Sequence, residues 1–159
     1  MEINTSLSDT LLDSPLDVYP EEHISLRSYL GHWVVLFFYP KDNTPGCTTE
    51  GIEFNTLIND FKKANALVLG VSKDSVKSHQ NFCTKHQFNF SLVSDTHQTL
   101  CNAFAVIKEK SIFNRIGLGI ERSTFLIDPS GQVVHAWRKV RAAGHAQEVL
   151  TTLQSMQKK

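Results

Sequence analysis

The chain has no excess of charge of either sign and no hydrophobic run of membrane length. Its 159 residues include 16 Lys or Arg and 16 Asp or Glu, so the formal net charge is zero. This balance does not supply the broad positive field that nucleic acid or an anionic membrane would attract. The longest uninterrupted apolar run covers residues 33–39, far fewer than the roughly 20 residues of a membrane-spanning helix. We therefore expect no nucleic-acid partner and no membrane association.

Cysteine is scarce. The three cysteines, Cys47, Cys83 and Cys101, are odd in number and show no C-x-x-C spacing. That pattern fits the disulfide framework of a secreted protein poorly and suits thiol chemistry in a reducing compartment. The first twenty residues are acidic and lack the basic and then apolar regions of a secretory signal. These observations predict a cytoplasmic protein.

No repeat, low-complexity tract or linker divides the sequence, and its length predicts a single domain over residues 1–159. Apolar runs predict buried strands, and a 3.6-residue apolar period predicts helices. The expected strands cover residues 33–39, 66–72 and 90–95, and the expected helices cover 48–62, 75–87, 97–104 and 144–156. Apolar segments flanking Asp-Pro-Ser-Gly predict a closing hairpin over residues 123–137.

Alternating strands and helices imply parallel pairing, to which the hairpin adds antiparallel strands. We therefore predict an α/β fold, with a mixed central sheet and helices on both faces. Sites in such folds form outside the carboxyl ends of the strands. Cys47 lies just past the end of the first buried strand, so its position alone makes it a candidate.

The segment around this cysteine reads TPGCTTE. Thr44 can be the N-cap of a helix that has Pro45 at its first position, which places Cys47 in the first turn. Unpaired backbone N–H groups and the helix dipole favour the thiolate there. Glu50 opposes this effect, so a compensating cation is expected. The alternative is a buried, inert cysteine that happens to follow a turn.

A reactive thiolate is insufficient for fast catalysis, because donors must also meet the charge that develops on the substrate. Thr44 offers a hydroxyl, and Arg122, just before the hairpin, offers a planar fork of donors. Each residue has a simpler interpretation. Thr44 could serve only as a helix cap, and Arg122 only as a solvated residue at a strand end.

The stretch FFYPKDNTPGCTTE resembles the active-site signature of the peroxiredoxins, with Pro40, Thr44 and Cys47 matching P-x-x-x-T-x-x-C. The segments YPKDNTPGCT, RSTFLIDPSG and GHAQEVL resemble the bacterioferritin comigratory protein (PrxQ) subgroup, over roughly residues 24–153. The resemblance implies a thioredoxin-like fold and a thiol peroxidase that needs no cofactor or metal and reduces hydrogen peroxide and organic hydroperoxides. It also implies recycling by thioredoxin or a similar dithiol reductant, and it favours a monomer.

By the same resemblance, Cys47 is the peroxidatic cysteine, Thr44 and Arg122 orient and polarise the peroxide, and Pro40 shields the thiolate from water. The sequence departs from the subgroup in two places. Many members carry a resolving cysteine five residues after the peroxidatic one, where this chain has Ile52. The usual Ala-Pro-Asp-Phe start is also missing, which leaves the first twenty residues unplaced.

A sulfenic acid on Cys47 must be resolved by another thiol before it is over-oxidised. Cys101 lies in a short apolar segment and is expected to be a packed core thiol, whereas the helix of Cys83 is largely polar and should open at low cost. We therefore predict Cys83 as the resolving cysteine. Direct resolution of Cys47 by an external thiol remains the alternative.

Two further alternatives use the same residues. His79, Cys83 and His86 fall at i, i+4 and i+7, and His97 and Cys101 at i and i+4, spacings that could present ligands for a structural zinc ion. The chain could also be a non-enzymatic interaction module with a thioredoxin fold.

Overall fold

The apolar run predicted as the first buried strand forms β3 (Trp33–Phe38) in a computed structural model that describes residues 1–112 and 115–158. Successive residues of the run point to opposite faces of the sheet, as a period of two requires. The side chains on one face are Val34, Leu36 and Phe38, and those on the other are Val35, Phe37 and Tyr39. Each set belongs to a different hydrophobic cluster, so the sheet separates two cores.

The central sheet has seven strands in the order β2-β1-β5-β4-β3-β8-β9. Strands β3, β4 and β5 pair in parallel, while β8 and β9 form the predicted antiparallel hairpin at one edge. Besides β3, the strands are β1 (Leu16–Tyr19), β2 (Glu22–Ile24), β4 (Ala66–Ser72), β5 (Ser91–Ser94), β8 (Ser123–Ile127) and β9 (Val133–Trp137). The prediction of a mixed sheet is confirmed.

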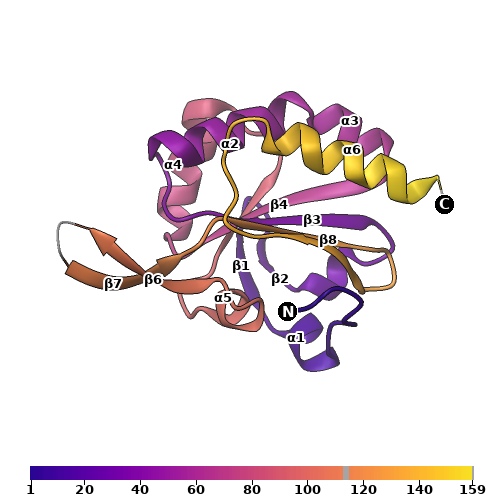
Figure 1. The fold of residues 1–159 in the computed structure, drawn as a ribbon, viewed down its shortest axis with the longest axis horizontal. Helices are drawn as coiled ribbons and strands as arrows, with labels where there is room; N and C mark the ends of the chain where they lie inside the picture. Colours follow the sequence, from indigo (N-terminus) through magenta and orange to yellow (C-terminus); the bar gives the residue numbers. More distant parts are fainter. Residues whose placement is uncertain (113–114, 159) are drawn as a thin grey trace.

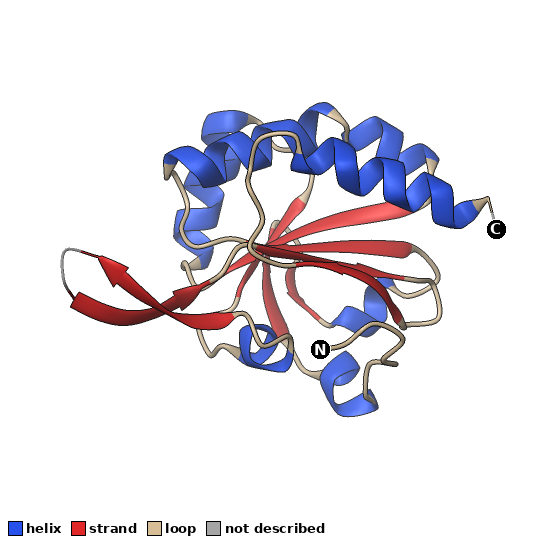
Figure 2. Cartoon of the chain, in the orientation of Figure 1, coloured by secondary structure: helices blue, strands red, loops and turns tan. Residues whose placement is uncertain are grey.

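Helices cover both faces of this sheet, as predicted (Figures 1 and 2). One face carries α2 (Pro45–Thr56), α3 (Ile58–Lys63), α4 (Val76–His86) and α6 (His145–Gln157). The other face carries α1 (Asp9–Asp13), the 3-10 helix η1 (Leu26–Tyr29) and α5 (Thr99–Ala103). The helices that bear Cys47 and Cys83 therefore lie on the same side of the sheet, and the helix that bears Cys101 lies on the other.

The single helix predicted over residues 48–62 is wrong in its extent. The helix includes the first turn from Pro45 that the TPGCTTE segment predicts, and it breaks at Leu57, whose φ of −96° and ψ of 6° end α2 and start α3. The predicted apolar face survives the break, because Phe54, Ile58 and Phe61 are buried. Periodicity in the sequence reports the buried face, and it does not report a local change of backbone direction within that face.

The start of the chain, predicted to be irregular, contains α1, β1, β2 and η1. Short elements of this kind carry too few residues for a clear period, and β1 is specified by pairing with β5, about 75 residues later in the chain. The sequence pattern also predicted no element between residues 105 and 121, where the structure has a second, two-stranded sheet of β6 (Ile107–Ile112) and β7 (Arg115–Ile120). This hairpin extends away from the rest of the molecule (Figure 1).

Over the two described segments, no helix combines the length and the apolar character that a bilayer crossing requires.

Candidate active site

Cys47 is the third residue of α2, directly beyond the carboxyl end of β3. The helix starts as predicted, with Thr44 in the N-cap position and Pro45 at the first helical position. The Cys47 side chain is only 2% exposed and packs within the cluster that underlies α2 and α4. A thiol in this place faces the unpaired backbone N–H groups of the first helical turn.

Arg122 reaches this thiol from a different part of the chain. Its Nη2 donates a hydrogen bond to Cys47 Sγ at 3.4 Å, and its Nη1 donates to Glu50 Oε1 at 2.7 Å. The approach depends on Gly46, since a Cβ at that position would lie 3.0 Å from Arg122 Nη2. Sulfur, guanidinium and carboxylate therefore form one buried cluster at the start of α2.

The charges in this cluster influence one another. Burial raises the pKa of Glu50 to about 7, although the Arg122 guanidinium acts in the opposite direction. Burial lowers the pKa of Arg122, but Glu50 and Cys47 more than offset this effect, so its pKa is raised overall. The compensating cation expected near Glu50 is thus present, and it is Arg122.

Thr44 does not cap α2 with its side chain. Its hydroxyl donates to the Lys41 carbonyl at 2.7 Å, and the helix start has no side-chain cap. Thr44 therefore occupies the N-cap position with its backbone, as predicted, but the prediction that its side chain caps the helix is wrong. The hydroxyl is half-buried one turn before Cys47, and its oxygen keeps free acceptor capacity.

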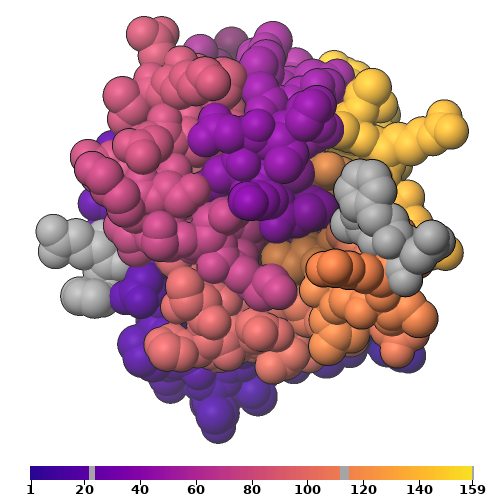
Figure 3. Space-filling view, turned by 90° about the vertical axis from the view of Figure 1, so that its left-hand side faces the viewer, coloured from indigo at the N-terminus to yellow at the C-terminus, as the bar shows by residue number. Residues whose placement is uncertain are grey.

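A pocket of about 860 Å³ is lined by Pro40, Lys73 and Lys110 together with strand β7, and its lining does not include Cys47, Glu50 or Arg122. Figure 3 shows this face, with the segment after β3 in purple and the hairpin in orange. Lys110 Nζ donates to the Ile120 carbonyl. Its pKa is lowered by burial and by the charge of Arg122, while the charge of Cys47 acts in the opposite direction. The site therefore holds a buried nucleophile and a fixed guanidinium.

Cys83 and Cys101 are both free and buried, and they occupy different cores. Cys83 shares a cluster with Cys47, whereas Cys101 is fully buried across the sheet, as expected for a packed core thiol. Burial raises the pKa of Cys83 to about 12, and the charge of Asp42 adds to this effect. Cys83 is therefore a poor nucleophile while α4 stays folded.

The zinc ligand sets considered from the sequence are not assembled. Within residues 1–112 and 115–158, the one group of three possible ligands is Asp42, Asp74 and His79, which contains no cysteine. Both ring nitrogens of His79 already have protein partners, Asp42 and the Val93 carbonyl. The spacing of His79, Cys83 and His86 reflects one helix and not a shared centre.

Three features of the site were missed from the sequence: Lys110, the exposed strand β7, and the polar contacts of Asp42 with His79. The strand had a readable signal, because Ile116, Leu118 and Ile120 recur with a period of two. The Asp42–His79 contact had none, because its partners are 37 residues apart and meet only through the pairing of the strands.

Comparison with known proteins gives a consistent result. The model of the AhpC/TSA family matches residues 9–136. Peroxiredoxin Bcp of Xanthomonas campestris pv. campestris is 59% identical over 143 residues, which cover 90% of this chain and 89% of that protein.

Two solved structures are similar over nearly the whole chain. The structure of a mutant of Xylella fastidiosa PrxQ has a TM-score of 0.94 at 53% identity and covers 98% of this chain and 97% of its own. A structure from a study of alkyl peroxide reduction by the bacterioferritin comigratory protein of Xanthomonas campestris has a TM-score of 0.91 at 54% identity, with coverage of 98% and 99%. The expected thioredoxin-like fold is confirmed.

Proposed function

Because the chain belongs to the AhpC/TSA family, and within it to the bacterioferritin comigratory protein (PrxQ) subgroup of peroxiredoxin peroxidases, we propose that Cys47 is its peroxidatic cysteine. The observation that carries this assignment is the 3.4 Å contact between Arg122 Nη2 and Cys47 Sγ at the start of a helix. We propose hydrogen peroxide and organic hydroperoxides as substrates. The alkyl peroxide reduction activity of the Xanthomonas campestris relative supports the second class.

In the first step, the Cys47 thiolate attacks the terminal oxygen of the hydroperoxide. An S–O bond forms, the O–O bond breaks, and the leaving alkoxide or hydroxide takes up a proton from solvent. The sulfur is oxidised to a sulfenic acid, and the peroxide is reduced to an alcohol or to water. Charge moves from sulfur to the leaving oxygen, so a fixed donor that reaches the peroxide oxygens bound next to the sulfur stabilises the transition state.

Arg122 is suited to supply that donor. The ion pair with Glu50 holds the guanidinium, and its Nη2 points at the reacting sulfur. We assign the Thr44 hydroxyl to orienting the peroxide, because it lies at the N-cap of the same helix and has an acceptor site free. Pro40, on the lining of the neighbouring pocket, limits the access of water.

We propose that Cys83 resolves the sulfenic acid. Its thiol condenses with Cys47–SOH to form a disulfide and water. Cys83 is on the same side of the sheet as Cys47, and it is the better candidate because the sheet lies between Cys47 and Cys101. Bonding requires the two Cα atoms to come within about 7 Å, and both thiols are buried in separate helices. We therefore infer that α2, α4 or both unwind locally.

The disulfide would then be reduced by thioredoxin or a similar dithiol, which would itself become a disulfide. Thiols that cycle in this way suit the reducing environment of the cytoplasm. Direct reaction of Cys47–SOH with an external thiol is the alternative mechanism, and it needs no contribution from Cys83.

The assignment of Cys47 is tested with the variant Cys47→Ser. A hydroxyl is barely ionised near pH 7 and cannot form a sulfenic acid, so peroxide consumption should fall to below a few per cent of wild type, by order of magnitude. Cys101→Ser is the matched control, because it removes a buried thiol on the other face of the sheet. Substantial activity in the Cys47 variant would refute the assignment.

The resolving thiol is tested separately. Cys83→Ser should keep the first turnover, lose most of its steady-state cycling with a thioredoxin system, and accumulate sulfinic acid. Mass spectrometry of wild-type protein after one equivalent of peroxide should find a disulfide that joins Cys47 to Cys83. Unimpaired cycling of Cys83→Ser would support resolution by an external thiol, and a disulfide from Cys47 to Cys101 would show that the wrong thiol was chosen.

A further inference from the structure

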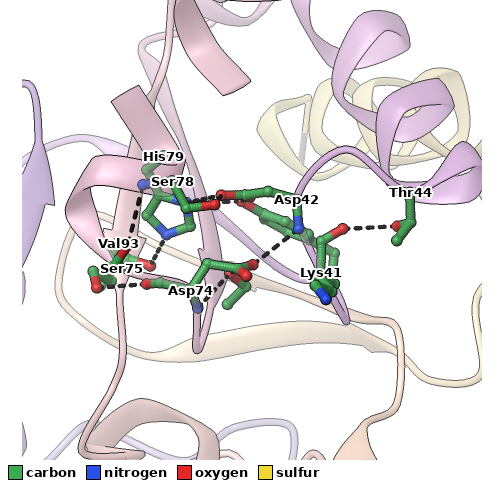
Figure 4. A network of polar contacts seen from close by, with 11 residues as sticks. Lys41, Asp42, Thr44, Asp74, Ser75, Ser78, His79 and Val93 are labelled. Carbon is green, nitrogen blue, oxygen red and sulfur yellow. Dashed lines mark hydrogen bonds and ion pairs between the residues drawn. The ribbon is translucent and has the colours of Figure 1, made fainter. Parts of the chain in front are cut away.

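A buried polar network lies at the carboxyl ends of β3, β4 and β5, outside the contacts of Cys47 (Figure 4). At its centre, the carboxylate of Asp42 accepts hydrogen bonds from the hydroxyl of Tyr39 at 2.6 Å, the hydroxyl of Ser78 at 2.8 Å and His79 Nδ1 at 2.7 Å. The Asp42 and His79 side chains are 1% and 0% exposed. A burial this complete is costly for polar groups, so the contacts must be well satisfied.

The network also determines the charge on His79. Its Nε2 lies 2.9 Å from the Val93 carbonyl oxygen, which can only accept a hydrogen bond, so this nitrogen carries a hydrogen. Its Nδ1 faces Asp42, which receives two hydroxyl donors as an ionised carboxylate does. We infer from this geometry that both ring nitrogens donate, which would make His79 the imidazolium cation of a buried ion pair.

This ion pair joins the two parts of the chain that the reaction uses. Asp42 lies in the short loop between Pro40 and Thr44, and its backbone N–H donates to the Asp74 carboxylate at 2.9 Å. His79 lies on α4, one helical turn before Cys83. The contacts of Asp42 with Ser78 and His79 therefore connect the loop that shapes the peroxide site with the helix that carries the predicted resolving thiol.

We propose that the Asp42–His79 ion pair is a latch that holds the closed, peroxide-reactive arrangement and opens when the disulfide forms. His79 acts as a positioning residue, through Asp42, on the loop that carries Pro40 and Thr44. The proposal rests on the function assigned above to Cys47 and Cys83. It predicts that loss of the latch moves the two chemical steps in opposite directions.

The opposite signs follow from population shift. The reaction with peroxide requires the closed arrangement, so a smaller closed fraction lowers the observed rate constant in proportion. Condensation with Cys83 requires the open arrangement, so the same change speeds disulfide formation. A substitution that only lowers global stability, and does not change the balance between the closed and open arrangements, would not shift the two rates in opposite directions.

The variants His79→Gln and Asp42→Asn remove the charge of one partner each and keep hydrogen-bonding groups in place. In rapid mixing with hydrogen peroxide, each should react at Cys47 about tenfold more slowly, a size common for coupling between sites. Disulfide formation should be several-fold faster, and a higher peroxide concentration should be needed for over-oxidation. The double variant should resemble either single variant, because both remove the same interaction.

Two matched controls separate the latch from general effects. Ser78→Ala removes one hydroxyl donor to the same Asp42 oxygen and keeps both charges of the pair, so the ratio of the two rates should change less than in His79→Gln. Val133→Ala creates a cavity in the core on the other face of the sheet, and it should lower stability without changing the ratio of the two rates.

A measurement on the wild-type chain does not depend on how any variant folds. Nitrogen-15 NMR of the His79 ring should show a hydrogen on each ring nitrogen in the reduced protein. The signals of these two N–H groups should be lost in the disulfide form.

The outcomes are distinguishable. A neutral His79 in the reduced protein, an unchanged signature after oxidation, or equal changes of both rates would overturn the latch while wild type still consumes peroxide. A wild-type chain that consumes no peroxide would instead overturn the proposed function. If no disulfide forms, the rate of the peroxide step is compared between Cys83→Ser and the double variant that also carries His79→Gln. A slower rate in the double variant would support positioning of the loop by the ion pair, and an equal rate would overturn it.

Discussion

At the scale of single residues, the site depends on one guanidinium that contacts two groups of different chemistry. The two nitrogens of the Arg122 fork bind Glu50 and Cys47 at the same time. A lysine ammonium is a point charge on a flexible stem and cannot make both contacts in a fixed plane. The geometry of the side chain, more than its charge, is therefore what the proposed mechanism needs.

Arg122→Lys should accordingly lower the second-order rate constant for hydrogen peroxide by roughly a hundredfold or more, the usual cost of losing one transition-state donor. Stopped-flow measurement of thiol oxidation gives this constant. Arg138→Lys is the control, because Arg138 contacts the carbonyls of Ala105 and Phe104 and not the thiol. A near wild-type rate in Arg122→Lys would mean that Arg122 has only a structural role.

Glu50 should make the free energy of unfolding depend on pH. Burial raises its pKa from 4.5 to about 7, so the folded protein holds a proton that the unfolded chain releases between these values. Stability therefore decreases as pH rises through this window, by about 3–4 kcal/mol in all, since one pKa unit corresponds to about 1.4 kcal/mol.

Urea unfolding of wild type and Glu50→Gln from pH 4.5 to 8 tests this effect. The stability of wild type relative to the variant should decline as pH rises. Burial lowers the pKa of His145 to about 4, which acts in the opposite direction between pH 4 and 6.5. That contribution is common to both proteins and cancels in the difference. A difference that stays constant with pH would contradict the proposed protonation of Glu50.

At the scale of secondary-structure elements, α4 is held differently along its length. Its first half is fixed by the Ser75 cap and by the ion pair of His79, whereas its end is held by the packing of Phe82 and Cys83 and by an Asn55 contact to the Gln87 carbonyl. The sequence pattern predicted that this helix would be largely polar and easily opened. That expectation is only partly right, because His79 is buried as well as Phe82 and Cys83.

Oxidation should therefore speed amide hydrogen exchange across residues 75–87 in α4, across 48–55 in α2, or across both, since at least one of the two helices must open to join the two sulfurs. Mass spectrometry of reduced and peroxide-treated protein measures this. Helix α1 is the internal control, because it carries no cysteine and packs on the other face of the sheet, so its exchange should be unchanged. Protection that is identical before and after disulfide formation would refute local unwinding.

At the scale of the whole molecule, the surface carries few large apolar side chains. Among the described residues, those that are exposed by more than a third are Ile3, Ile52, Val76, Ile116 and Leu118. Only the last two lie close together, on β7, and a contiguous patch of that size is common on monomers.

We therefore expect a monomer in solution, with a mass near 17.9 kDa by light scattering coupled to size-exclusion chromatography. A mass near twice this value, at micromolar concentration, would be inconsistent with the expectation. In that case, Ile116→Ser with Leu118→Ser would show whether the β6–β7 hairpin makes the contact.

The sequence by itself determined the features that depend on neighbouring residues. The apolar runs predicted β3, β4 and β5, and the turn TPGCTTE predicted a helix that starts with Pro45 and has Cys47 in its first turn. Each of these signals is local, because strand alternation, helix periodicity and capping act over a few residues. The family resemblance rests on this segment together with RSTFLIDPSG and GHAQEVL, which are equally short.

Only the tertiary structure decided which distant residues meet. Arg122 is 75 residues from Cys47 in the chain, and His79 is 37 residues from Asp42. Neither pair leaves a periodic trace in the sequence, because the order of strands in the sheet brings each pair together. The sheet also places Cys83 on the same side as Cys47 and Cys101 on the other. Helix periodicity could predict that a cysteine is buried, but the face of the sheet against which it is buried follows from long-range pairing.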